Sequence, residues 1–192
     1  MESMFFFIDI ILGLACLGVM IILYRTGRIE PHHWKLFWLG VLLGLAWELG
    51  CNLQMIYGNA PVARFLRPLP FPFPVIVAVH SLWDGALFMM GVWLVRRLFG
   101  ADSFRRFRLR ELLVFILWGQ VQELAVEIIS LRSGAWEWVV YPWNPALFHV
   151  EGFAITLFPQ LIWLGAVLVF YPAAVRMHRS ANLTGSVPAA LR

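Results

Sequence analysis

The stretch that decides the fold is MFFFIDIILGLACLGVMIILY, residues Met4 to Tyr24, in which Asp9 is the one charged residue. A helix needs about 20 consecutive apolar residues to cross the roughly 30 Å hydrocarbon core of a membrane. Glu2 precedes the stretch, and Arg25 and Arg28 follow it, whereas a cleaved secretory signal carries its positive residues first. We therefore expect a retained transmembrane helix.

Four more stretches along the chain have the same length and character. They are Trp34–Tyr57, Phe73–Leu98, Leu109–Leu131 and about Gly152–Pro172. The whole chain of 192 residues is 61% hydrophobic, whereas soluble domains average about 45–50%. These features predict an all-α fold, a polytopic bundle of about five transmembrane helices over residues 1–179. The polar segment 180–192 has no periodicity and is expected to be disordered.

Two connections between the predicted helices are unusual in composition. Residues 61–74 are rich in proline, and residues 136–149 are rich in aromatic side chains. Tryptophan is enriched where a membrane meets water, so we expect the aromatic connection to lie at the membrane surface. Cys16 and Cys51 fall within apolar stretches, and a disulfide between them is therefore not expected.

Lysine and arginine are distributed unequally between the two sides of the predicted bundle. Three lie around the first connection, six around the third and three in the C-terminal segment, whereas the opposite side holds Arg64, Arg67 and Arg132. Positive residues concentrate in cytoplasmic loops, so we expect the N-terminus outside and the C-terminus in the cytoplasm. The net charge of +4 is explained by this pattern and does not indicate a nucleic-acid partner. Arginine outnumbers lysine 14 to 1, which favours a GC-rich bacterium and its cytoplasmic membrane.

Polar and ionisable residues interrupt four of the predicted spans. They are Glu48 and Asn52 in the second, His80 and Asp84 in the third, Gln120, Glu123 and Glu127 in the fourth, and Gln160 in the fifth. Residues three or four apart share one helix face, and an ionisable residue at the helix centre costs about 2.5–3.5 kcal/mol or more. With alternating helix directions, all of them fall in the outer half of the membrane. The pattern predicts one polar cavity inside the bundle, open toward the outside.

Simpler explanations remain open for some of these residues. Asn52, Gln120 and Gln160 could equally form hydrogen bonds between helices. Glu127 lies near a helix end, where it could equally sit at the membrane interface or have a function. For Asp9, a position at the membrane interface is the better explanation.

Four of the residues have the chemistry of general acid–base catalysis: Glu48, His80, Asp84 and Glu123. A carboxylic acid in an apolar cavity can donate a proton, and a histidine one turn away can relay it. Tryptophan faces stabilise cations, and Trp47, Trp83 and Trp118 lie beside the polar positions. The expected substrate-binding residues are therefore Trp47, Asn52, Trp83, Trp118, Gln120, Glu127 and Gln160.

The stretch His80-Ser81-Leu82-Trp83-Asp84-Gly85 resembles the His-x-x-x-Glu-Gly element of the emopamil-binding-protein (EXPERA) family of sterol isomerases. Gly119-Gln120 and Pro159–Trp163 are similar to parts of that family's later helices. Trp47-Glu48 and Trp83-Asp84 also resemble the acidic pairs of small integral-membrane terpene cyclases. Both resemblances imply that an alkene or epoxide is protonated and that acidic and aromatic residues guide the carbocation. In the isomerases, the histidine element lies one helix earlier than here.

The leading hypothesis is a membrane enzyme that isomerises or cyclises a sterol, terpenoid or similar lipid without a cofactor. Asp84 or Glu48 would be the proton donor, His80 its partner, and Glu123 with Gln120 the opposing acid–base group. The expected partners are the apolar substrate, membrane lipids and a possible second copy of the chain. The rival hypotheses are a small proton-coupled transporter or lipid-binding protein, and a metal-dependent lipid hydrolase with hard carboxylate ligands. Motifs of hydrolases, nucleotide-binding loops and zinc proteases are absent from the sequence.

Overall fold

Five long helices form the protein in the computed structural model, which describes residues 4–185. The helices are α1 (Met4–Arg25), α2 (Pro31–Tyr57), α3 (Phe73–Phe99), α4 (Leu109–Ser133) and α5 (Leu157–Gly185). Each is long and apolar enough to cross a membrane, which confirms the five predicted spans. Their outer faces carry exposed apolar side chains such as Ile11, Ile22 and Leu117, as a lipid environment requires.

The observed helix boundaries differ from the predicted ones mainly at α5. This helix begins five residues later than expected, at Leu157, and it continues through Pro172 to Gly185. The helix therefore includes residues 180–185 of the segment that we expected to be disordered, and residues 186–192 lie outside the described part of the chain. Helix α2 begins earlier, with Pro31 in its first turn, where the missing amide hydrogen of proline costs nothing.

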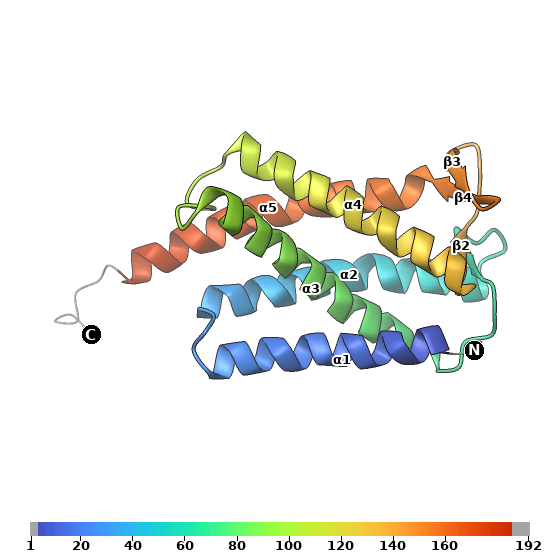
Figure 1. Cartoon of the computed structure of the whole chain (residues 1–192), viewed down its shortest axis with the longest axis horizontal. Helices are drawn as coiled ribbons and strands as arrows, with labels where there is room; N and C mark the ends of the chain where they lie inside the picture. Colours follow the sequence, from blue (N-terminus) through green and yellow to red (C-terminus); the bar gives the residue numbers. More distant parts are fainter. Residues whose placement is uncertain (1–3, 186–192) are drawn as a thin grey trace.

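The two unusual connections form short strands that the sequence analysis did not predict. Strand β1 (Ala63–Phe65) pairs antiparallel with β2 (Trp136–Trp138), and β3 (Ala146–Val150) pairs antiparallel with β4 (Phe153–Thr156). All four strands lie at the end of the bundle where α1 begins (Figure 1). We call this the strand end, and the opposite end, with connections 26–30 and 100–108, the loop end.

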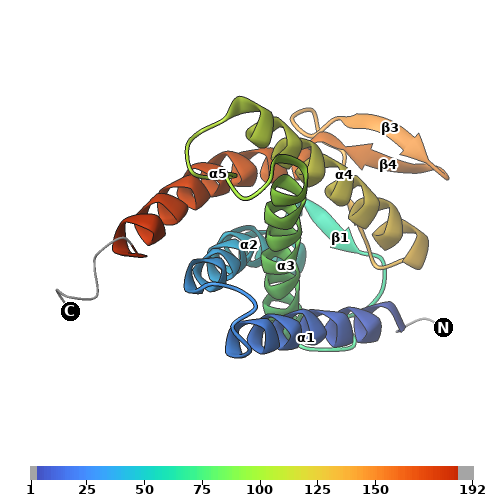
Figure 2. The same ribbon diagram turned by 60° about the vertical axis from the view of Figure 1, so that its left-hand side comes forward.

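Helix α3 runs through the middle of the bundle and packs against α1, α2 and α4 (Figure 2). Helices α2 and α3 approach closely because Gly40 lies against Gly85, in the way that small residues bring membrane helices together. Toward the loop end, the core is aromatic. Phe88 stacks on Phe170 with 4.4 Å between ring centroids, and Phe115 stacks on Phe170 at 5.5 Å.

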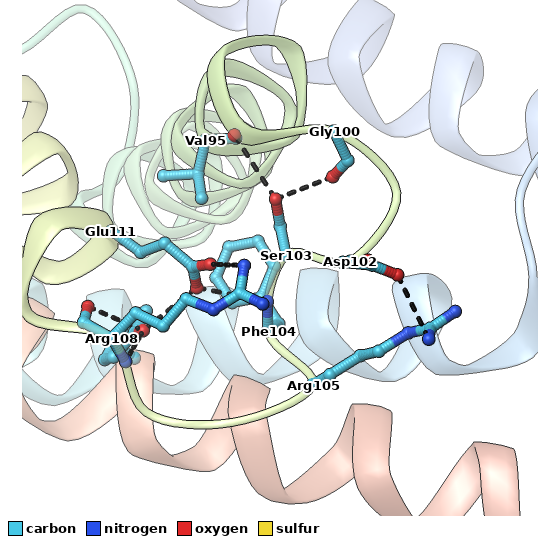
Figure 3. Close-up of polar contacts among 9 residues, drawn as sticks. Val95, Gly100, Asp102, Ser103, Phe104, Arg105, Arg108 and Glu111 are labelled. Atoms are coloured by element: carbon cyan, nitrogen blue, oxygen red, sulfur yellow. Dashed lines mark hydrogen bonds and ion pairs between the residues drawn. The ribbon is translucent and has the colours of Figure 1, made fainter.

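The connection from α3 to α4 is fixed at the loop end by the fully buried carboxylate of Glu111 (Figure 3). Its oxygens accept hydrogen bonds from the Phe104 backbone amide at 3.1 Å and the Tyr171 hydroxyl at 3.0 Å. Arg108 pairs with the same carboxylate at 3.1 Å. A buried carboxylate is tolerated when it is paired and hydrogen-bonded in this way, so Glu111 has a structural role.

Most of the arginines gather at this loop end. Arg25 and Arg28 flank the first connection, six arginines lie between Arg96 and Arg110, and Arg176 and Arg179 lie in the last part of α5. Among the described residues, the helix directions therefore place these arginines on one side, as the sequence analysis expected.

Candidate functional site

A cavity of about 490 Å³ lies in the half of the bundle nearest the strand end. All five helices contribute to its wall, and strands β1 and β2 close it at the strand end through Ala63, Phe65, Trp136 and Trp138. Most of its lining is apolar. The polar and ionisable lining residues are Asp9, Glu48, Cys51, Asn52, His80, Asp84, Gln122 and Glu123.

His80 is the centre of a polar chain that joins three helices. Its Nε2 lies 2.7 Å from Asp9 Oδ2 on α1, and its Nδ1 lies 3.2 Å from Glu48 Oε2 on α2. Asn52 Nδ2 donates to the same Glu48 oxygen at 3.2 Å. Each imidazole nitrogen thus faces a carboxyl group, and a proton on either nitrogen has an acceptor.

Asp84 lies one helical turn after His80 and is buried, with 6% of its surface exposed. Its side chain packs directly on Gly44 of α2, where no space remains for a Cβ atom. Among the described residues, Asp84 Oδ2 has no hydrogen-bond partner. A buried polar atom without a partner is costly, and this oxygen lies against Gly44, with no room for a ligand group on that side.

Glu123 and Gln122 approach the cavity from α4, and both are buried. Trp163 of α5 lines the cavity as well. Gln122 Nε2 donates to the Gly119 carbonyl at 3.0 Å, and its Oε1 has no partner among the described residues. Helix α4 therefore supplies a second acidic group and a free amide oxygen, separate from the His80 chain.

Five tryptophans form the aromatic wall of the cavity. They are Trp47, Trp83, Trp136, Trp138 and Trp163. Trp47 and Trp163 contact one another with 5.4 Å between ring centroids, and Trp136 lies 5.4 Å from the His80 ring. Trp83 is fixed by a 3.2 Å hydrogen bond from its Nε1 to the Asp9 carbonyl. The cavity therefore presents several π faces next to acidic groups.

The cavity reaches the outer face of the bundle through apolar residues. Three lining side chains are also exposed on the surface: Ile8 at 46%, Leu12 at 44% and Ile129 at 56%. The first two lie on α1 and the third on α4. An apolar mouth on the lateral face of a membrane protein suits a molecule that arrives from the lipid.

The structure brings together the four residues predicted to be catalytic, since Glu48, His80, Asp84 and Glu123 all line the cavity. Trp47, Asn52 and Trp83, from the predicted substrate-binding set, line it as well.

The other four predicted binding residues lie outside the cavity wall. Trp118 Nε1 donates to the Leu87 carbonyl of α3 at 2.8 Å, and Gln120 Nε2 donates to the Gln160 carbonyl of α5 at 3.1 Å. Glu127 is fully buried and accepts a hydrogen bond from the Thr156 backbone amide. These residues join helices and strands, which was the alternative explanation for the two glutamines; Glu127 joins α4 to β4.

The sequence analysis missed several residues of the cavity. Asp9 was assigned to the interface because nothing in the sequence reveals its partner, His80, which lies 71 residues away. Gln122 was passed over for Gln120, but residues two apart on a helix point about 200° apart, and it is Gln122 that lines the cavity. Trp136 and Trp138 were assigned to an interfacial belt, and only the pairing of β1 with β2 shows that they cover the cavity.

A carboxylate metal site in this cavity remained open from the sequence. Among the described residues, a group of three or more potential ligand atoms within 4.8 Å of one another lies at the loop end instead, and it consists of His32, His33 and His178. No known protein family, curated protein or solved structure matches the chain.

Replacing Gly44 with alanine tests the position of Asp84. The new methyl group would overlap the Asp84 carboxyl group, and overpacking of this kind costs about 1–3 kcal/mol. We expect a lower melting temperature in detergent for Gly44→Ala. Gly50→Ala is the matched control on the same helix, since nothing lies within 4 Å of its added Cβ, and it should be neutral or stabilising.

The clash should disappear when Asp84 is shortened. In the Asp84→Ala background, Gly44→Ala should therefore cost much less stability than in the wild type, as a double-mutant cycle would measure. Equal costs in the two backgrounds would show that the Asp84 side chain does not lie against Gly44.

Proposed function

We propose that the protein is an integral membrane enzyme that isomerises or cyclises a sterol- or terpenoid-type lipid by acid–base chemistry, without an organic cofactor. The observation that carries the proposal is the convergence of four carboxyl groups and one histidine on a tryptophan-lined cavity with an apolar lateral mouth. Its volume of about 490 Å³ falls within the usual range for small-molecule sites.

The charge balance of the cavity supports proton chemistry. Asp9, Glu48, Asp84 and Glu123 face it, and His80 is the one basic side chain among its described lining residues. If all four carboxyl groups were ionised, even a charged His80 would leave three negative charges uncompensated in an apolar site. Unpaired buried charges are strongly disfavoured, so the cavity is suited to hold protons on its carboxyl groups.

Asp84 is the better of the two candidate proton donors. Glu48 Oε2 already accepts a hydrogen bond from Asn52 and faces His80. In Asp84, the unpartnered Oδ2 lies against Gly44, so the other oxygen, Oδ1, would carry the donated proton into the cavity. The Asp84 carboxylic acid would donate its proton to one carbon of an alkene, or to an epoxide oxygen, and leave a carbocation on the substrate. In the isomerisation, the new C–H bond uses the electron pair of the former double bond.

The aromatic wall would then stabilise the cation, since a desolvated cation over a tryptophan face gains about 2 kcal/mol or more. Trp47, Trp83 and Trp163 are placed for this role. Glu123, on the opposing helix, would remove a proton from a neighbouring carbon, and the electrons of that C–H bond would form the new double bond. The composition of the substrate is unchanged, so no redox cofactor is needed. The proton that Glu123 gains would then have to return to Asp84, through His80 or water, before the next turnover.

We further propose that the loop end faces the cytoplasm of a bacterial cell, which places the N-terminus outside and the C-terminus inside. The arginines gathered at the loop end support this orientation. The cavity would then lie in the outer half of the membrane. Fusions test this directly: fluorescent protein joined to the C-terminus should fluoresce, and alkaline phosphatase inserted at position 60 should be active. The reverse pattern would contradict the orientation.

Deuterium from the solvent tests the chemistry. The purified chain, equilibrated in D₂O, would be incubated with squalene, its epoxide and a sterol that carries a ring double bond. We expect one of them to give an isomeric product, detected by mass spectrometry, which carries deuterium on carbon if an alkene is the group protonated. Asp84→Asn and Glu123→Gln should each lower the rate by about 100-fold or more, the usual contribution of a general acid or base.

Asp102→Asn serves as the matched control, because Asp102 is exposed at the loop end, where it pairs with Arg105, and this variant should keep the wild-type rate. Full turnover in both Asp84→Asn and Glu123→Gln would contradict the proposed roles. Conversion of squalene or the sterol without deuterium on carbon would contradict the proton-transfer mechanism. The epoxide is protonated on oxygen, where deuterium exchanges, so its product is not expected to carry the label on carbon.

A further inference from the structure

A second group of functional side chains lies at the loop end, away from the cavity. His32 and His33 begin α2, and His178 lies near the end of α5. All three are buried, with 7–8% of their surfaces exposed. One ring nitrogen from each lies within 4.8 Å of the others, although 146 residues separate His32 from His178.

We propose that His32, His33 and His178 bind a transition-metal ion that prefers imidazole ligands, such as Zn²⁺. Zinc binds histidine nitrogens at about 2.0–2.1 Å with tetrahedral geometry, which separates two ligand nitrogens by about 3.3 Å. The Nε2 atoms of His32 and His178 are 3.2 Å apart. Three histidines leave the fourth position of a tetrahedral ion free for water or another ligand.

The surroundings of His32 favour the metal-binding tautomer. Glu30 Oε2 lies 3.3 Å from His32 Nδ1. A hydrogen on Nδ1 is held by this carboxylate, and the Nε2 lone pair is left to face His178. A carboxylate behind a ligating histidine is the common arrangement in metal sites, where it fixes the ring and increases its basicity.

Packing contacts alone do not explain why three histidine rings are buried together. The His178 ring contacts His32, with 4.1 Å between centroids, and Phe104, with 5.4 Å, as apolar rings would. However, His33 Nδ1 and His178 Nδ1 are buried and have no hydrogen-bond partner among the described residues. A metal ion bound through the Nε2 atoms would not partner these Nδ1 atoms, but it would hold together three buried imidazoles that otherwise share one hydrogen bond, between His32 and His178.

Arg96 is the group that competes with the ion. Its Nη1 lies 2.7 Å from His33 Nε2, and a guanidinium can only donate, so His33 accepts there. Ligation through this nitrogen would displace Arg96 from His33. The positive charge of Arg96 also opposes a cation nearby, so its removal should leave metal binding unchanged or make it tighter.

The test uses the full chain in detergent, without a polyhistidine tag, stripped of metal and then titrated with Co²⁺ and Zn²⁺. We expect one equivalent of Zn²⁺ per chain and the visible absorption bands of tetrahedral Co²⁺. His32→Ala and His178→Ala should each weaken binding by at least about 100-fold, since even second-shell partners are worth 10–100-fold. Arg96→Gln should bind at least as tightly as wild type.

The two remaining histidines are the controls. His149→Ala, on exposed β3, and His80→Gln, in the cavity, should keep one equivalent of metal. Loss of binding in His80→Gln would overturn the proposal and place the ion in the cavity. Absence of stoichiometric binding in the folded wild type, or wild-type affinity in a His32→Ala/His178→Ala double variant, would also overturn it.

A measurement on the wild type covers the case in which the variants do not fold. Zn²⁺ should protect His32, His33 and His178 from modification by diethyl pyrocarbonate, and should leave His149 as reactive as before. Peptide mass spectrometry locates the modified residues. Because the three rings are buried, the metal-free protein is treated long enough for each to react, and equal modification after Zn²⁺ is added would contradict the site. The outcome is independent of the proposed enzyme function, because the histidine cluster and the cavity share no residue.

Discussion

An ionisable side chain in a hydrocarbon environment must find a partner inside the protein, and this constraint organises the bundle. Asp9, His80 and Glu48 come from three different helices and satisfy one another through His80. The contact ties the apolar helix α1 to α3 and α2 at the depth where the cavity lies. Without these partners, each group would be a buried polar atom in an apolar wall, so the polar chain and the helix arrangement depend on one another.

The two halves of the bundle have different roles as a consequence. Toward the loop end, stacked rings of Phe88, Phe115 and Phe170 fill the interior, and Glu111 fixes the connection that follows. Toward the strand end, the helices diverge around a cavity, and the β1–β2 pair closes it with tryptophan. A rigid apolar core on one side thus positions acidic groups on the other, which is the arrangement that a preorganised acid–base site requires.

The sequence analysis predicted the five helices and about half of the residues of the candidate site, for clear physical reasons. Long apolar stretches predict spans by length alone, and alternating helix direction places Glu48, His80, Asp84 and Glu123 at one depth. It could not predict the contacts between helices, because the depth of a residue in the membrane does not determine which neighbouring helix its side chain contacts. Asp9, Gln122 and the tryptophans of β2 were missed for that reason, and Gln120 and Trp118 were assigned to the cavity although they join helices. In the sequence, the only sign of the histidine cluster is the adjacent pair His32-His33, because the third member, His178, follows 145 residues after His33.

The central claim is that the cavity holds an apolar lipid substrate next to the Asp84 carboxyl group. The most direct test is mass spectrometry of the lipids that co-purify with the protein in mild detergent, comparing wild type with Asp84→Asn. The account predicts a terpenoid or sterol-like lipid bound to the protein, with an unconverted precursor enriched in the variant. Bulk phospholipid alone in both samples would contradict it.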